Sequence, residues 1–323
     1  MKGPETLYVE PTNRCNLACS TCPRTFFPGE PEADMPLERF REVLEQVPGV
    51  RRIVLHGMGE PLLHRRVHEM VALAVARGAH VLFNTNGVLL TRAVAGRLVD
   101  AGLHELRVSV DMPDPGLYRE VRSGGNLGRV YRNVEGLITL RDARGAAVPA
   151  VSFWMTEGRS RLRYLAALVR DAARLGVREV YVQRLILMGR GDAVEGEAVF
   201  GRRTDADRAH LAEADRVARE LGVSLWGSGD RSAADEGAGA LRPWQECRRP
   251  YAAAYVTANG NLLPCCLTPF TAAGRAGDFV LGNVFETRFA TLWSGPAYGE
   301  LRKQFASESP PECCRLCGTR WSL

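Results

Sequence analysis

The sequence Pro11-Thr-Asn-Arg-Cys-Asn-Leu-Ala-Cys-Ser-Thr-Cys-Pro-Arg-Thr25 decides how the rest of the chain is interpreted. It places Cys15, Cys19 and Cys22 in C-x3-C-x2-C spacing. Three thiolates on one short loop can bind three irons of a cubane [4Fe–4S] cluster and leave the fourth iron open, whereas a cluster that only carries electrons usually has four cysteine ligands. Structural zinc also needs four ligands, and no fourth Cys or His lies close by. Reduced core thiols are the remaining alternative, but neighbours such as Asn, Arg and Pro are not typical of a core.

This stretch resembles the cluster loop of the radical S-adenosylmethionine (SAM) superfamily, and in particular of members with a C-terminal SPASM or twitch extension. The resemblance implies that Cys15, Cys19 and Cys22 bind a [4Fe–4S] cluster whose open iron is chelated by SAM. One position departs from the pattern, because Thr21 stands where superfamily members often have an aromatic residue. Contact with the adenine of SAM must then come from elsewhere.

Bulk properties limit the possible classes of protein. The 323 residues, 46% of them hydrophobic, suffice for one large core and a small appendage. No run approaches the roughly 20 apolar residues of a membrane span, and no signal peptide is seen at the N-terminus, so we expect a cytoplasmic protein. Nine cysteines then indicate reduced thiols that bind metal. The net charge of +5 is dispersed, so we expect neither nucleic acid nor membrane as a partner.

Short apolar strands alternate with amphipathic helices from residue 6 to about residue 228. Six β-α repeats imply a parallel sheet with right-handed crossovers, and six are too few for a complete eight-stranded barrel. Periodicity alone equally allows a doubly wound sheet, whereas the resemblance implies an α/β fold with a partial (β/α)6 barrel. The expected strands are 7–10, 52–56, 80–84, 105–110, 148–155 and 179–187, and the expected helices are 36–47, 65–78, 91–101, 128–144 and 160–175.

The last third of the chain changes in character. A helix is expected at 205–221 and a short strand at 224–226, before small and polar residues typical of a linker. A β-hairpin with an Asn-Gly turn is expected over 251–265, followed by a helix over 291–305. We therefore predict a partial barrel at residues 1–228, a linker at 229–246 and an auxiliary cluster domain at 247–323.

A second set of thiols lies in that auxiliary domain, namely Cys247, Cys265, Cys314 and Cys317. Their ligand chemistry fits either zinc or an iron–sulfur cluster. The spacing C-x12-G-x4-C, followed by C-x2-C, resembles the twitch domain, a truncated SPASM domain, which implies one auxiliary [4Fe–4S] cluster. Cys266 and Cys313 each adjoin a presumed ligand, so the register between neighbours stays open. Each is either a buried structural thiol or a hydrogen-atom donor in catalysis.

Further residues are implied in binding SAM. The segment Gly57-Met58-Gly59-Glu60-Pro61 ends the second strand and resembles the superfamily's GGEP motif, which binds the amino group of SAM. Its glycines allow a close backbone approach, and its carboxylate suits an ammonium group. Polar residues at later strand ends are expected to face the barrel lumen, as are Glu10 and His56. The resemblance implies cofactor or substrate contacts for Asn84, Ser109, Asp111 and Arg122, whereas Gln183 is expected to face SAM or substrate in the lumen because it is a polar residue in an otherwise apolar strand.

The resemblance also implies the reaction class. An electron from a flavodoxin or ferredoxin reduces the cluster, SAM is cleaved, and a 5′-deoxyadenosyl radical abstracts hydrogen from the substrate. Our first hypothesis is oxidation of a secondary alcohol on a cyclitol or sugar of an aminoglycoside-type natural product, because the auxiliary spacing resembles that of 2-deoxy-scyllo-inosamine dehydrogenase-like members. The auxiliary cluster then accepts the second electron.

Three alternatives remain open. The first is a radical epimerase that uses Cys266 or Cys313 as hydrogen donor. The second is maturation of a ribosomally made peptide, although the cluster loop begins at residue 15 and leaves no room for the peptide-binding domain that many maturases place before it. The third, a non-catalytic electron-transfer protein, does not explain an open cysteine triad together with the glycine-rich segment at 57–61.

Overall fold

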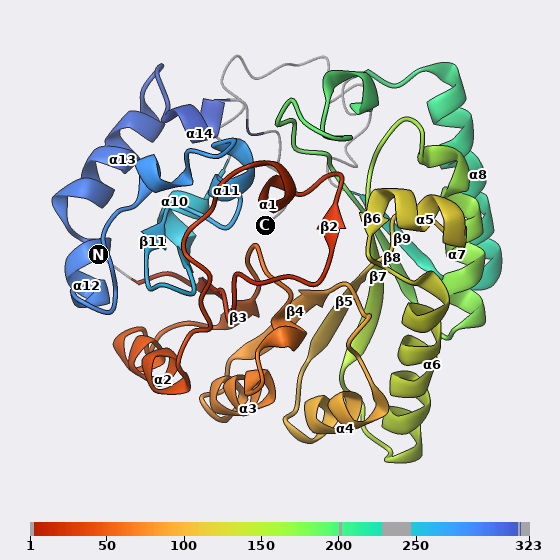
Figure 1. The fold of residues 1–323 in the computed structure, drawn as a ribbon, viewed down its shortest axis with the longest axis horizontal. Helices are drawn as coiled ribbons and strands as arrows, with labels where there is room; N and C mark the ends of the chain where they lie inside the picture. The colour runs from red at the N-terminus through yellow and green to blue at the C-terminus, as the bar shows by residue number, and fades with distance from the viewer. Residues whose placement is uncertain (1–2, 200–201, 228–246, 316, 318–323) are drawn as a thin grey trace.

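A computed structural model describes residues 3–199, 202–227, 247–315 and 317 (Figure 1). The predicted linker at 229–246 lies outside these residues. The fold is mixed α/β around a nine-stranded sheet with the order β11-β10-β1-β3-β4-β5-β7-β8-β9. Its strands are β1 (Thr6–Val9), β3 (Arg52–Leu55), β4 (His80–Thr85), β5 (Glu105–Ser109), β7 (Ala150–Thr156), β8 (Glu179–Gln183), β9 (Ser224–Gly227), β10 (Ala253–Val256) and β11 (Leu262–Leu263).

The predicted partial barrel is confirmed by the six strands from β1 to β8 in this sheet, which pair in parallel in the order expected for successive β-α units. Helices cover the outside of the sheet, while the loops at the strand ends converge towards its centre (Figure 1). The main helices are α2 (Leu37–Gln46), α3 (Val67–Ala76), α4 (Arg92–Asp100), α6 (Leu127–Ala143), α7 (Leu165–Arg174) and α8 (Asp205–Leu221).

The C-terminal hairpin extends the barrel sheet at its other edge. β10 pairs in parallel with β1, so that Thr6 lies opposite Ala253 and Val9 opposite Val256. β11 then pairs antiparallel with β10, as the hairpin prediction requires. The auxiliary part of the chain is therefore joined to the barrel by backbone hydrogen bonds, and the space between the two parts is enclosed on one side by a continuous sheet.

Several predicted elements have different bounds in the structure; the helix expected at 160–175, for example, is divided into η2 (Leu162–Tyr164) and α7. The strand expected at 179–187 ends at Gln183, which lies opposite Thr156, the last residue of β7. The helix expected at 291–305 is divided into α12 (Phe289–Trp293) and α13 (Pro296–Ala306). Pro296 has no N–H and its ring would clash with a carbonyl four residues earlier, so the first helix cannot continue through it.

Several short elements were not predicted. A two-stranded ribbon joins β2 (Ala18–Cys19) to β6 (Arg122–Ser123), and four of the short helices, α1 (Pro23–Phe26), α10 (Arg249–Ala252), α11 (Thr268–Thr271) and α14 (Glu312–Arg315), lie beside cysteines or contain them. The ribbon and these four helices lie in the parts of the chain that bear the cysteines. The other short helices are η1 (Pro61–Leu63), α5 (Pro115–Val121), η2 (Leu162–Tyr164), η3 (Glu195–Glu197) and η5 (Ala276–Phe279).

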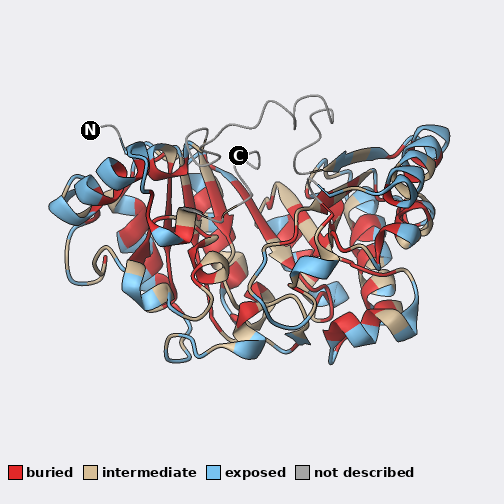
Figure 2. Cartoon of the chain, turned by 90° about the horizontal axis from the view of Figure 1, so that it is seen from above, coloured by how far each residue is buried: buried red, intermediate tan, exposed pale blue. Residues whose placement is uncertain are grey.

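The core lies between the sheet and its outer helices, where burial is greatest (Figure 2). Successive side chains on a strand face opposite sides. In β5, Leu106 and Val108 face the helices and are fully buried, whereas Glu105, Arg107 and Ser109 are partly buried on the other side. The same alternation holds in β1 and β8, so polar residues at the strand ends face the inside of the partial barrel. Within the described residues, no helix is both long and apolar enough to span a bilayer.

Candidate active site

The cysteine triad lines one cavity at the carboxyl ends of the strands. Cys15, Cys19 and Cys22 are all partly buried and face it from the loop between β1 and α1. The ribbon of β2 and β6 holds this loop, with Cys19 opposite Arg122. A second strap comes from Asp192, whose carboxylate accepts a hydrogen bond from the Ser20 hydroxyl at 2.5 Å and whose N–H donates to the Ser20 carbonyl at 2.9 Å.

The donor set fits an iron–sulfur cluster better than a single metal ion. Within the described parts of the chain, no three His, Cys, Asp or Glu side chains converge to hold one ion, whereas the ligands of a cubane each bind a different iron. Burial raises the pKa of Cys15 and Cys19 above the usual range and raises that of Cys22 to about 12. These thiols are therefore poor nucleophiles by themselves, and they become thiolates when they coordinate a metal cation.

Polar groups from several strands face the same cavity as the triad. Of the residues expected to contact SAM or substrate, the structure brings Gly57, Gly59, Glu60, Asn84, Ser109, Arg122 and Gln183 to its lining. Met58, Pro61 and Asp111 do not line it. Sequence reasoning missed Thr156, which ends β7 and lines the cavity. The sequence could have indicated Thr156, because a polar residue at the carboxyl end of an apolar parallel strand lies at this edge of the sheet.

The glycines of the 57–61 segment are required by packing. A Cβ atom at Gly59 would overlap the backbone carbonyl oxygens of Thr12 and Arg14, and one at Gly57 would overlap the Glu10 side chain. The N–H of Glu60 also donates to the Arg14 carbonyl at 2.8 Å. The segment thus lies directly against the chain that leads into the cysteine loop.

Gly59→Ala is expected to destabilise the protein by about 1–3 kcal/mol, because the added methyl group overpacks a site closed by backbone atoms. The matched control is Gly136→Ala in α6, where a Cβ would have no atom within 4 Å. That change should stabilise the helix by roughly 0.5–1 kcal/mol. Thermal unfolding of the two variants beside the wild type measures both effects, and equal melting temperatures would contradict the close packing at Gly59.

Glu60 is bonded within the chain. Its side chain is 3% exposed and accepts hydrogen bonds from the Thr85 hydroxyl at 2.6 Å, the Asn86 N–H at 2.7 Å and the Leu62 N–H at 3.2 Å. Burial raises the pKa of this carboxyl, while the hydrogen bonds oppose that shift. These bonds hold the turn against the end of β4, and because Glu60 also lines the triad cavity, its role towards the ammonium group of SAM stays a prediction.

Asp111 and Arg122 form a buried ion pair behind Cys19. Arg122 Nε lies 2.7 Å from Asp111 Oδ2, and Asp111 Oδ1 accepts the Thr156 N–H at 2.7 Å. The other side of the guanidinium donates to Cys19 Sγ at 3.7 Å. Burial opposes the charge of Arg122, but the Asp111 carboxylate more than offsets it, and its pKa lies above the usual range. Asp111, expected as a cofactor contact, is instead the counter-ion of Arg122.

A second cavity contains the other cysteines. It is lined by Cys247, Cys265, Cys313, Cys314 and Cys317. Cys266 does not line it, because this buried thiol points the other way and accepts a hydrogen bond from Arg249 at 3.4 Å. The geometry therefore favours Cys265 over Cys266 as ligand, whereas Cys313 and Cys314 both face the cavity with their sulfurs 3.9 Å apart.

One residue connects the two sites. Leu267, two residues after Cys265, lines both the triad cavity and the auxiliary cavity. Phe270 of α11 lines the triad cavity as well. The auxiliary part of the chain therefore forms a wall of the candidate active site. No feature of the sequence singled out these apolar residues.

Glu10 is a further buried carboxyl at the end of β1. Burial raises its pKa from 4.5 to about 7, although hydrogen bonds from the Ala258 and Met58 N–H groups oppose the shift. The folded protein therefore binds this proton more tightly than the unfolded chain does. The stabilisation is complete below about pH 4.5 and is lost as the pH rises through about 7.

Glu10→Gln is expected to remove this pH dependence. Between pH 6 and pH 8 the wild type should lose about 1 kcal/mol of stability through Glu10, given 1.36 kcal/mol per pKa unit. The variant should lose less over the same interval, since its amide does not titrate. Thermal unfolding at the two pH values measures the difference, and parallel behaviour of the two proteins would contradict a raised pKa.

Comparison with known proteins identifies two domains in this chain. A family model of the radical SAM superfamily matches residues 9–141, and a model of the SPASM iron–sulfur cluster-binding domain matches residues 247–318. The chain contains a radical SAM domain followed by a SPASM domain. These domains imply SAM and iron–sulfur clusters as cofactors, in agreement with the two cysteine-lined cavities.

Relatives of known name differ in function. The chain is 30% identical to a tungsten-containing aldehyde ferredoxin oxidoreductase cofactor-modifying protein of Pyrococcus furiosus, over 56% of this chain and 51% of that protein. It is 24% identical to the PqqA peptide cyclase of Granulibacter bethesdensis, over 99% of this chain and 81% of that one. The chain spans about half the length of most of the curated relatives that we compared.

Solved structures share the fold. Streptococcus suis SuiB bound to its precursor peptide SuiA superposes with a TM-score of 0.75 and 17% identity, over 99% of this chain and 71% of SuiB. BtrN in complex with AdoMet and 2-DOIA gives a TM-score of 0.52 and 18% identity, over 98% of this chain and 93% of BtrN. The likeness to SuiB extends across both domains of the chain.

Proposed function

We propose that this chain is a radical SAM enzyme that oxidises its substrate and passes the second electron to an auxiliary cluster. The observation that carries this proposal is the position of Leu267, which lines both the triad cavity and the auxiliary cavity. An acceptor separated from the reacting substrate by about one side chain is suited to take an electron from it.

The residues of the site have separate tasks in this proposal. Cys15, Cys19 and Cys22 bind the first cluster, and Cys247, Cys265 and Cys317 bind the second together with Cys313 or Cys314. Bound there, the clusters and SAM would supply the radical that abstracts hydrogen and the acceptor for the remaining electron. The substrate loses one hydrogen atom, then a proton and an electron, so the product has two hydrogens fewer. Asn84, Ser109 and Gln183 orient the bound molecules.

A peptide is the substrate class with the most support. The likeness to the PqqA peptide cyclase covers 99% of this chain, and the likeness to SuiB, bound to its precursor peptide, covers the same share at a TM-score of 0.75. We therefore propose maturation of a peptide by oxidation. A flavodoxin or ferredoxin is the proposed electron donor.

A cyclitol or sugar remains the second candidate, because BtrN was solved with AdoMet and 2-DOIA and its fold resembles this chain. The epimerase hypothesis has less support. Cys266 lines neither cysteine-lined cavity, and Cys313 lines only the auxiliary one. Within the described residues, neither of these two thiols therefore faces the triad cavity, where a hydrogen donor would be needed.

The test is a turnover assay on the anaerobically reconstituted protein with SAM and a low-potential reductant. A peptide encoded beside the gene and an aminocyclitol are supplied in separate reactions, and products are analysed by mass spectrometry. We expect a peptide product two hydrogens lighter than its substrate. Cys265→Ala should still form 5′-deoxyadenosine but not this product, whereas the control Cys266→Ala should form both. A product of unchanged mass containing one hydrogen from solvent would overturn the proposal in favour of epimerisation.

A further inference from the structure

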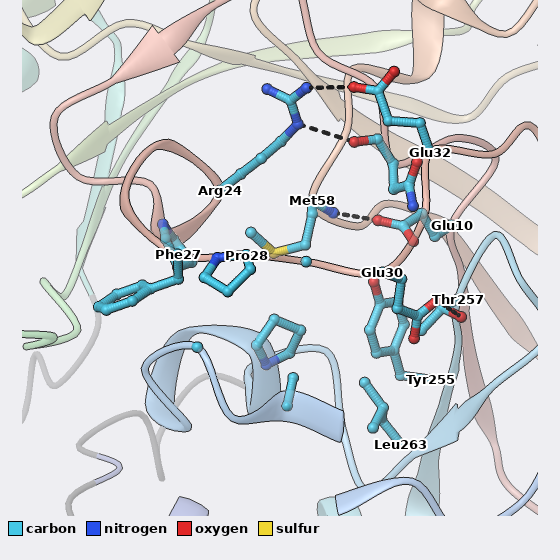
Figure 3. Close-up of a pocket in the computed structure, with 16 residues that line it drawn as sticks. Glu10, Arg24, Phe27, Pro28, Glu30, Glu32, Met58, Tyr255, Thr257 and Leu263 are labelled. Atoms are coloured by element: carbon cyan, nitrogen blue, oxygen red, sulfur yellow. Dashed lines mark hydrogen bonds and ion pairs between the residues drawn. The ribbon is translucent and has the colours of Figure 1, made fainter. Parts of the chain in front are cut away.

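A third cavity, of about 290 Å³, lies in the seam between the barrel and the SPASM domain (Figure 3). We call it the seam cavity. Its barrel side is formed by the end of β1, the segment around α1, and Met58; its other side is formed by β10, β11 and the chain after α11. Phe27, Pro28, Met58, Leu263 and Pro269 give it a mostly apolar wall. The seam cavity and the triad cavity have no lining residue in common. They are close neighbours, because Met58 lines the seam cavity while Gly57 and Gly59 on either side of it line the triad cavity.

Three carboxylates and one arginine also line the seam cavity. Arg24 Nη2 lies 3.3 Å from Glu32 Oε1, and in this ion pair Arg24 is partly buried while Glu32 is exposed. Glu10 and Glu30 form no ion pair within the described residues, so the lining has two uncompensated acidic groups. Glu10 is only 2% exposed. The ionised form of an acidic group inside an apolar cavity without a counter-ion is unfavourable, so the group either takes up a proton or binds a cation.

The structure holds both carboxyl groups in fixed positions. Glu10 Oε1 accepts the Met58 N–H at 2.5 Å and Oε2 accepts the Ala258 N–H at 3.1 Å. Glu30 accepts hydrogen bonds from Thr257 at 2.8 Å, Asn259 at 3.0 Å and Asn261 at 3.1 Å. Since a carboxylate offers about four lone-pair sites, each group retains capacity for another donor. All of these donors are neutral, so they do not compensate the negative charge of either carboxylate in its ionised form.

We infer that the seam cavity binds a primary ammonium group at the end of an apolar chain, such as a lysine side chain of a peptide substrate. This inference deepens the proposed function and rests on it for the identity of the ligand. The apolar wall suits the methylene stem, while the two carboxylates suit an ammonium with three donors. A metal ion fits less well, because no three ligating side chains converge among the described residues.

Two further observations agree with this inference. The raised pKa of Glu10 has burial as its largest cause, and the nearby charge of Glu30 adds to it. A cation bound between them would relieve both effects. The cavity also adjoins the cysteine loop, since Pro23 directly follows Cys22 and lines the seam cavity. A side chain anchored there would therefore fix a peptide beside the triad.

The experiment measures binding of two probes to the reconstituted full chain by calorimetric or NMR titration. One probe is N-acetyl-lysine methylamide, and the other is its norleucine analogue, which lacks the amine. We expect the lysine probe to bind at least tenfold more tightly, as for a hydrogen-bonded charge. Glu10→Gln and Glu30→Gln should each remove most of this preference. The matched control Glu42→Gln changes an exposed carboxylate of α2 that does not line the cavity, and it should retain the preference.

Several results would overturn the inference. These are equal affinity for the two probes, no binding of either, or a lysine preference that persists in both Glu10→Gln and Glu30→Gln. The comparison of probes on the wild type needs no variant, so misfolding of one variant does not prevent the test. Formation of 5′-deoxyadenosine by the same samples reports on the proposed function separately. Failure of that assay with intact lysine binding would reject the enzyme proposal and leave the amine site in place.

Discussion

Replacing Cys15, Cys19 and Cys22 together with alanine should lower the iron content from about eight to about four per chain, the values expected for two cubane clusters and one. Formation of 5′-deoxyadenosine should fall below detection, because in our proposal the triad supplies every protein ligand of the first cluster. The expectation follows from the position of the three thiols around one cavity. Iron and sulfide are measured after anaerobic reconstitution of the variant and the wild type.

The control for this experiment is Cys266→Ala. That thiol is buried beside Arg249 and lines neither cysteine-lined cavity, so the variant should keep about eight irons. A wild type with about four irons and bound zinc, whose triad variant has none, would instead make the auxiliary site structural. Such a site accepts no electron. The oxidation proposal would then have to be abandoned, while the triad would remain the site of SAM cleavage.

The grouping of the cysteines around two cavities could be predicted in part from the sequence, because some of these residues are close together in the chain. Spacing alone brings Cys15, Cys19 and Cys22 onto one loop, and it brings Cys314 and Cys317 together. The spacing of Cys265 and Cys266 could not decide which thiol faces a cavity, since that depends on the position of Arg249 and of the hairpin against β1. Their difference became visible only in the folded chain.

The partners of Glu60 and Asp111 could not be predicted for a related reason. Each carboxylate is held by groups distant in sequence: Thr85 and Asn86 bond to Glu60, and Arg122 pairs with Asp111. A motif in the sequence shows which residue is present but not which partner occupies its lone pairs. The division of the helix at Pro296, by contrast, was predictable from proline geometry alone.

The fold shows the same distinction. Six β-α units follow from local periodicity and were predicted, apart from an overlong sixth strand. The pairing of β10 with β1 joins residues 253–256 to residues 6–9, and no local pattern specifies a contact over that distance. This pairing matters for function, since it closes the seam cavity and brings Leu267 to the wall of the triad cavity.

Arg122→Met should destabilise the protein by about 3–5 kcal/mol, because it leaves the Asp111 carboxylate buried without a counter-ion. Asp111 is fully buried and Arg122 is 9% exposed. The double variant Arg122→Met, Asp111→Leu should recover part of the lost stability. Replacing both partners of a buried ion pair with apolar groups costs less stability than removing one partner and leaving the other charge unpaired. Thermal unfolding and iron content of the two variants measure these effects.

Arg14→Met provides the matched control. Arg14 Nη2 lies 2.5 Å from Asp34 Oδ2, a distance as short as that in the buried pair of Arg122 and Asp111. The side chains of Arg14 and Asp34 are, however, 41% and 38% exposed. Water can solvate Asp34 when its partner is removed, so the loss should stay below about 1 kcal/mol. Equal losses at Arg14 and Arg122 would mean that solvent reaches Asp111 and that its pairing does not depend on burial. A large loss at Arg122 alone, accompanied by lower iron content, would identify this ion pair as the support that positions Cys19 through the guanidinium.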